Sequence, residues 1–294
     1  MDLDQTLRAM ARSGIRLAIG EAGGIPVGRF GGTPDVPADF VWPVFETGTF
    51  DDDTVKPRPL SFLAQFDCAA LAALDPEGLL PREGMLSFFY ELGSQRWGFD
   101  PKDAGCARAY WFPDKAALAP TEFPAELEPD YRLPPLAIGG AIMSTYPDFP
   151  DFSLTRPDIA HPSYWEQVRG GWNGFCEEFD KTVSALRGPE DTSVPLHRFL
   201  GWPAIIQNNM TLECELVSRG HYLGGMWETV TEEEKRAASE TSLEGWRLLF
   251  QLDTVSCEGF ELMFGDCGCI YYYIRKEDLS ARRFDRIWLI QQCF

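Results

Sequence analysis

The sequence lacks the features of an exported or membrane-inserted protein. No apolar run approaches the ~20 residues that a helix needs to cross a bilayer. The opening Met1-Asp2-Leu3-Asp4 also lacks the basic and then apolar stretches that begin a secretory signal. We therefore expect a cytoplasmic protein that does not associate with membranes.

Basic residues are scarce relative to acidic ones. Lys and Arg number 26 against 45 Asp and Glu, which gives a formal net charge of −19. This charge repels nucleic-acid phosphates and attracts cations and basic proteins. The composition therefore predicts no nucleic-acid partner. It leaves two interpretations of the acidity, which are solubility alone or the capture of a basic protein.

Metal-binding patterns are missing as well. The chain has 3 histidines, which are scattered, and 8 cysteines, of which only Cys267 and Cys269 form a close pair. A zinc site takes about four ligands, and neither group provides such a set. We expect no metal and no cofactor, and we expect free thiols, as is usual in a reducing compartment.

No catalytic or nucleotide-binding signature is present. The glycine-rich stretch 20–32 has neither the GxGxxG spacing of a dinucleotide site nor the Lys-Ser/Thr ending of a phosphate loop. No Gly-x-Ser-x-Gly or Cys/His signature provides a nucleophile that His197 would activate as a base. The sequence therefore identifies no catalytic residue and leaves open whether the protein is an enzyme.

The sequence is rich in apolar and aromatic residues. They make up 45% and 13% of the chain respectively, which is enough for a large core. Apolar patterning predicts strands over 15–19, 61–67, 85–90, 246–253 and 269–274. Short helices are predicted over 3–11, over 68–74 with Asp67 as N-cap, and after Thr231, where Thr231 and Glu234 form a capping box. We expect an α+β fold of mostly antiparallel strands with short peripheral helices.

Three patches recur in the same order along the chain. Arg29-Phe-Gly-Gly-Thr-Pro34 is echoed by Arg198-Phe-Leu-Gly-Trp-Pro203, 169 residues later. Gln65 matches Gln251 at an offset of 186, and Gly84 matches Gly268 at an offset of 184. Ordered recurrence of this kind indicates a diverged duplication. We expect one unit over 1–294, with a first pseudo-repeat at 25–115, an intervening acidic, Pro-rich and helical region at 116–195, and a second pseudo-repeat at 196–294.

These patches also carry a family resemblance. They comprise Gly-x-Pro-x-x-Pro before Trp42-Pro43, Phe62–Asp67, His197–Pro203 with Gln207, and Leu248–Asp253 with Gly265-Asp266-x-Gly268. Together they resemble the YwqG-like family of uncharacterised, mainly bacterial proteins. The resemblance runs from about residue 31 to the C-terminus and is loose over about 113–195. It implies a duplicated α+β fold and no established activity, because that family is described as a domain of unknown function.

The repeated patches contain candidate binding residues. Gln65 and Asp67 are two residues apart on a strand, as are Gln251 and Asp253, so each pair shares one face. The two pairs can converge on a site between the repeats. Alternatively, the glutamines bond loop backbone and the aspartates cap turns. His197, Gln207 and Asp266 are further candidates, and Asp266 also suits a purely structural role in its turn.

An acidic loop and a tryptophan suggest a surface for a partner. Asp51, Asp52 and Asp53 crowd one loop near Trp42, and charge with a buried ring is a favourable combination at interfaces. The alternative is a solvated loop with Trp42 packed inward. The leading hypothesis is a non-catalytic binding module for a basic partner, such as a toxin-neutralising immunity protein. The alternative is an enzyme or small-ligand-binding protein that uses a Gln/Asp site between the two repeats.

Overall fold

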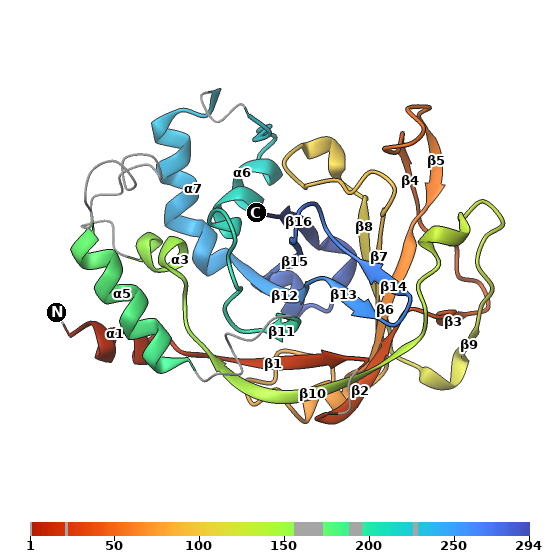
Figure 1. Cartoon of the computed structure of the whole chain (residues 1–294), viewed down its shortest axis with the longest axis horizontal. Helices are drawn as coiled ribbons and strands as arrows, with labels where there is room; N and C mark the ends of the chain where they lie inside the picture. The colour runs from red at the N-terminus through yellow and green to blue at the C-terminus, as the bar shows by residue number, and fades with distance from the viewer. Residues whose placement is uncertain (1, 21–22, 156–172, 188–195, 226–228) are drawn as a thin grey trace.

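The structure is a computed structural model that describes residues 2–20, 23–155, 173–187, 196–225 and 229–294 (Figure 1). Its centre is one ten-stranded sheet in which all neighbouring strands are antiparallel. In spatial order the strands are β16 (Trp288–Gln292), β15 (Cys269–Arg275), β12 (Trp246–Leu252), β11 (Arg198–Leu200), β1 (Arg12–Ile19), β10 (Leu136–Thr145), β2 (Ile25–Phe30), β6 (Ser61–Asp67), β7 (Met85–Tyr90) and β8 (Ala107–Phe112). The expected α+β class and the antiparallel pairing are confirmed.

Smaller elements lie around this sheet. Three two-stranded ribbons pair β3 (Asp35–Pro37) with β9 (Leu118–Pro120), β4 (Val44–Thr47) with β5 (Lys56–Pro59), and β13 (Val255–Cys257) with β14 (Phe260–Leu262). The α-helices are α1 (Leu3–Ala9), α2 (Cys68–Ala72), α3 (Phe149–Leu154), α5 (Asn173–Leu186), α6 (Met210–Ser218), α7 (Glu232–Gly245) and α8 (Lys276–Ser280). In Figure 1, α1, α3, α5, α6 and α7 gather at one end of the molecule, and β3, β4, β5 and β9 lie at the other. Within the described ranges, no helix has the length and apolarity to cross a membrane.

Two of the helices begin as their N-terminal sequences predict. Asp67 caps α2 by accepting from the backbone N–H groups of Ala69 and Ala70. Thr231 and Glu234 form the expected capping box at the start of α7. Both arrangements satisfy N–H groups that the first turn of a helix leaves without a partner.

The core lies inside the curled sheet, where aromatic rings from the two halves of the strand order pack against each other. Phe66 on β6 packs against Phe199 on β11 and Phe250 on β12, with ring centroids 4.7 and 5.3 Å apart. Both contacts are edge-to-face, the arrangement that ring quadrupoles favour. Because β6 and β12 are separated by four strands in the sheet order, these contacts require the sheet to bend around the rings.

The echoed patches occupy matching places in the sheet. Arg29 pairs with Gln65 where β2 meets β6, and Arg198 pairs with Gln251 where β11 meets β12. Each arginine donates to a carbonyl four residues later, to Thr33 at 2.6 Å in the first half and to Trp202 at 3.2 Å in the second. The turns that follow the two arginines share one backbone feature, since residues 31 and 32, like residues 200 and 201, have positive φ.

The next pairings match too. The register between β6 and β7 shifts between Phe62 and Ala64, and the register between β12 and β15 shifts between Leu248 and Phe250. These positions are related by the same offset of 186 that relates the two glutamines. A β-bulge is a specific local irregularity, so its presence at both positions strengthens the correspondence.

Strand β10 was not expected from the sequence, which assigned 116–195 to an intervening region. It runs through the middle of the sheet and pairs with β1 and β2. Its Gly139 and Gly140 interrupt the apolar pattern that marks a strand. A Cβ on Gly139 would overlap the carbonyl of Gly23, so the glycine permits close packing of the 23–24 turn. Parts of the same region, 156–172 and 188–195, lie outside the described residues.

Candidate functional site

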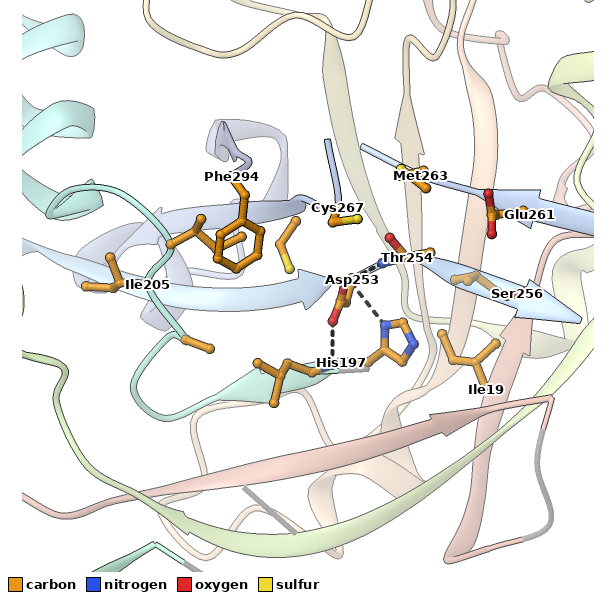
Figure 2. Close-up of a pocket in the computed structure, with 15 residues that line it drawn as sticks. Ile19, His197, Ile205, Asp253, Thr254, Ser256, Glu261, Met263, Cys267 and Phe294 are labelled. Atoms are coloured by element: carbon orange, nitrogen blue, oxygen red, sulfur yellow. Dashed lines mark hydrogen bonds between the residues drawn. The ribbon is translucent and has the colours of Figure 1, made fainter. Parts of the chain in front are cut away.

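A cavity of about 520 Å³ lies where β12 ends (Figure 2). Its walls are the segments around β11, the β13–β14 hairpin, the turn before β15, and the ends of β1 and of the chain. The lining residues are Ile19, Leu196, His197, Ala204, Ile205, Ile206, Asp253, Thr254, Val255, Ser256, Glu261, Met263, Cys267, Cys269 and Phe294. Most of them are apolar, and the volume falls in the range of small-molecule sites.

His197 is the only ring nitrogen donor in this lining. It lies directly before β11, its carbonyl accepts from Leu17 N at 3.0 Å, and its side chain is only 2% exposed. Its Nδ1 accepts from the backbone N–H of Asp253 at 3.1 Å. Burial lowers the pKa of His197 to about 4, although the negative charge of Asp253 acts in the opposite direction. The ring is therefore neutral near pH 7, with its proton on Nε2.

Asp253 links the segment before β11 to the end of β12. One carboxylate oxygen accepts from Leu196 N at 2.8 Å and the other from Thr254 N at 2.6 Å. The carboxylate is thus occupied by backbone donors, and the chain before β11 is fixed to the end of β12. The dashed lines in Figure 2 mark these bonds and the bond to His197.

The two cavity cysteines differ in environment. Cys269 is buried, and burial together with the neighbouring Asp253 charge raises the pKa of its thiol well above the usual range. It therefore remains a thiol, the unreactive form. Cys267 is exposed and has a positive φ of 50°. All eight cysteines are free, and among the described residues no group of three or more His, Cys, Asp and Glu could hold a metal ion.

The equivalent place in the first half is filled by a helix. Asp67, which matches Asp253, caps α2 and also pairs with Lys115 Nζ at 2.7 Å. After Asp253 the chain continues as β13 instead of turning into a helix. The segment Thr254-Val-Ser-Cys257 is β-branched at two of its four positions, which disfavours helix. The cavity therefore lies at the end of β12, where no helix follows the strand.

The repeated glutamines bind backbone within their own halves. Gln65 accepts from Asp35 N at 3.2 Å and donates to Asp35 O at 2.6 Å. Gln251 accepts from Ala204 N at 3.0 Å and donates to Leu196 O at 2.8 Å. Asp35 and Ala204 are themselves 169 residues apart, so the accepted bond is the same in both halves.

The structure does not bring the two Gln/Asp pairs together between the halves. Phe66 and Phe250 point into the shared core, and side chains alternate along a strand, so Gln65 and Gln251 face away from it. Asp67 lies at the start of α2, and only Asp253 of the four lines the cavity. Gln251 supports the cavity indirectly, because its side chain bonds the backbone of two lining residues, Ala204 and Leu196.

Gln207 and Asp266 lie near the cavity without lining it. Gln207 is exposed, and its amide donates to Cys293 O at 2.7 Å. Asp266 is exposed as well, and its backbone carbonyl accepts from Phe294 N at 3.1 Å. Both residues therefore support the C-terminal segment that ends at the cavity.

Trp42 and the Asp51–Asp53 loop belong to a different region. Trp42 is half-buried, donates to Leu60 O at 2.9 Å and packs edge-on against Phe89. Asp52 bonds Thr54 and also pairs with Arg58 at 2.8 Å and Lys56 at 3.2 Å; these bonds lower its pKa well below the usual range. Asp51 and Asp53 are exposed. Of the three aspartates, Asp52 therefore has a structural role.

Sequence reasoning found His197 and Asp253 and missed the rest of the lining. Ile205, Ser256, Glu261 and Met263 lie in segments that have no motif, and only the fold brings them together. One signal was available. The helix-forming Cys68-Ala-Ala-Leu-Ala72 after Asp67 has no counterpart after Asp253, and this contrast marks the strand end where the cavity lies.

Comparison with known families gives one match. A family model described as a domain of unknown function, DUF1963, matches residues 28–293. This span leaves out β1 and the start of β2 but includes the other strands of the central sheet and every lining residue of the cavity except Ile19 and Phe294. No curated protein matches the chain.

Proposed function

The chain belongs to the DUF1963 family, a domain of unknown function, and we propose that it binds a small, mainly apolar molecule in the cavity at the end of β12. The observation that carries this proposal is the cavity itself, about 520 Å³ with a mostly apolar lining. Sites of this size and character are typical of small-molecule binding. The proposal corresponds to the small-ligand alternative that the sequence suggested. Its site, however, lies at Asp253 in the second half and not between the two halves.

His197 gives the cavity a polar anchor. Its Nδ1 is used by Asp253 N, and its Nε2–H makes no hydrogen bond to any described residue. The ring lines the cavity, so a ligand that presents an acceptor to Nε2 gains a hydrogen bond. The burial that keeps the ring neutral also keeps this donor available across the physiological pH range.

Cys267 provides a direct test of binding. It lines the cavity and is exposed, whereas Cys257 on β13 is half-buried and lies outside the lining. We expect 1-octanol to slow labelling of Cys267 by N-ethylmaleimide, measured by peptide mapping, and to leave Cys257 unaffected. The variant Ile205→Trp fills the cavity and should abolish this protection. Equal labelling rates of Cys267 with and without the alcohol would overturn the proposal.

A second candidate function is the capture of a basic protein, with an immunity protein as its concrete form. It is favoured by an exposed apolar groove beside Trp42, where Val41 is 83% exposed and Val44 is 52% exposed. Asp51 and Asp53 lie in the loop that follows β4, and an acidic loop with apolar groups on the same hairpin suits a basic partner with an apolar anchor. The cytoplasmic location and the YwqG-like resemblance remain predictions alongside it.

A further inference from the structure

The charged groups of the cavity are of one sign. Among the described residues, its lining contains two carboxylates, Asp253 and Glu261, a neutral His197, and no Lys or Arg. Asp253 is occupied by two backbone N–H groups. Glu261 on β14 is exposed and forms no hydrogen bond or ion pair with any described residue. The cavity thus presents one unused carboxylate to whatever it holds.

Glu261 and the two hydroxyl side chains of the cavity lie toward one of its ends. In Figure 2, Glu261, Ser256 and Thr254 lie on one side of Asp253 together with the apolar Met263 and Ile19, and Phe294 and Ile205 lie on the other. The end at the β13–β14 hairpin therefore mixes polar and apolar side chains, and the end formed by the loop after β11 and Phe294 is apolar. An elongated ligand with one polar terminus matches this division.

From these two observations we propose that the cavity selects a small organic cation, with a primary ammonium group at Glu261 and an apolar body against Ile205 and Phe294. The inference rests on the proposed function, since it names the ligand class of the same site. The net charge of −19 acts in the same direction. A strongly acidic protein concentrates cations near its surface and repels anions.

Three probes of equal chain length separate charge from apolar burial. Octylamine, 1-octanol and octanoate at pH 7 carry a positive charge, no charge and a negative charge, and their affinities are measurable by isothermal titration. We expect octylamine to bind up to about fivefold more tightly than 1-octanol, the size of an exposed ion pair. Octanoate should bind least tightly, and the amine preference should shrink as salt is added.

A variant and a matched control assign the effect to one carboxylate. Glu261→Gln should bring the affinity for octylamine down to the affinity for 1-octanol measured on the same variant. Glu258→Gln removes an equal charge from the exposed turn of the same hairpin, outside the lining, and should preserve the amine preference.

The outcomes distinguish the two proposals. If 1-octanol binds and octylamine binds no more tightly, or if Glu261→Gln keeps the preference, the cation inference is overturned and the ligand-binding function stands. If octanoate binds most tightly, the inference is likewise overturned. If none of the three probes binds, both proposals fail.

Discussion

At the scale of single residues, Asp67 and Asp253 show how one repeated carboxylate has acquired two structural roles. Asp67 caps α2, and Asp253 accepts from Leu196, 57 residues away. Asp67→Ala should lower the free energy of unfolding by about 1 kcal/mol, as is usual for an N-cap. Asp253→Ala takes away the acceptor of the Leu196 and Thr254 N–H groups, both partly buried, and should cost about 2 kcal/mol. Urea denaturation of the two variants measures both values.

Asp253→Asn is the control for this comparison, because one amide oxygen still accepts a backbone bond. It should cost less than Asp253→Ala. A larger loss for Asp67→Ala than for Asp253→Ala would contradict the assignment. The capping role was predictable because it involves neighbours in sequence. The bond to Leu196 was not, because it depends on β11 lying beside β12.

We predict that His197 makes the free energy of unfolding depend on pH. Its pKa is lowered to about 4 in the folded protein by burial, and an unfolded histidine titrates near 6.5. Between these values the unfolded state binds more protons, so stability rises from about pH 4 to about pH 6.5 and levels off above. The contribution amounts to up to roughly 3 kcal/mol.

The measurement is urea unfolding at several pH values. His197→Asn places an amide oxygen near the position of Nδ1 and cannot take up the proton, so its stability should depend less on pH in this window. His221→Asn alters a histidine that lies 3.6 Å from Glu234 outside the cavity, and it serves as the control. Equal slopes for His197→Asn and the unmodified protein would refute the prediction.

At the scale of elements, the two halves of the sheet form matching sets of strands. β10-β2-β6-β7-β8 corresponds to β1-β11-β12-β15-β16, with the axis of symmetry between β1 and β10. We infer that the fold is a diverged duplication. The sequence predicted it through the echoed patches. It did not predict which strand would be the inner one of each set. β1, from the start of the chain, belongs with the C-terminal strands, and β10 belongs with the N-terminal ones. No local sequence pattern indicates this arrangement.

The glutamines test whether the two halves share a site. Gln65→Leu removes both the acceptor of Asp35 N and the donor to Asp35 O, and Gln251→Leu does the same to Ala204 N and Leu196 O. Each change should cost about 2 kcal/mol, because two partly buried backbone groups lose their partners. The two glutamines have no bonding partner in common, so the double variant should be additive within about 0.5 kcal/mol.

Chemical denaturation of the single and double variants checks this expectation. A coupling energy well above that margin would indicate that the four Gln and Asp residues act together between the halves, as one of the sequence hypotheses held. Gln207→Leu is a suitable control, because this glutamine is exposed and its amide reaches only Cys293 O.

The cavity illustrates what sequence patterns leave undetermined. Strands β6 and β7 were predicted from apolar runs, which report burial directly. The lining of the cavity includes Ile19, Ile205, Glu261 and Phe294, whose positions depend on four separate segments meeting. Apolar residues in loops read as ordinary core, so the empty space between them becomes visible only once the sheet has curled.

At the scale of the whole molecule, the acidic charge can act through exposed surfaces remote from the cavity. In Figure 1 the β4–β5 hairpin stands at the end of the molecule opposite the helices. Phe50 and Val55, in the loop between its strands, are 75% and 70% exposed. Two exposed apolar side chains on one loop can provide the apolar contact of an interface. The loop also contains Asp51 and Asp53, so a basic partner is the kind that it suits.

The structure makes the test of this partner sharper, because only two of the three aspartates are available. Asp51→Asn with Asp53→Asn removes exposed charge, whereas Asp52→Asn breaks the contact to Arg58 and should lower stability. A basic protein captured from the source cell should therefore associate more slowly with the double variant, and the association rate should fall as salt rises, since charge steers encounter. Association rates at low and moderate salt, with thermal unfolding of each variant as the folding control, provide the measurement. Capture of only neutral or acidic proteins, or an unchanged rate for the double variant, would remove the basic-partner hypothesis and leave the cavity as the supported site.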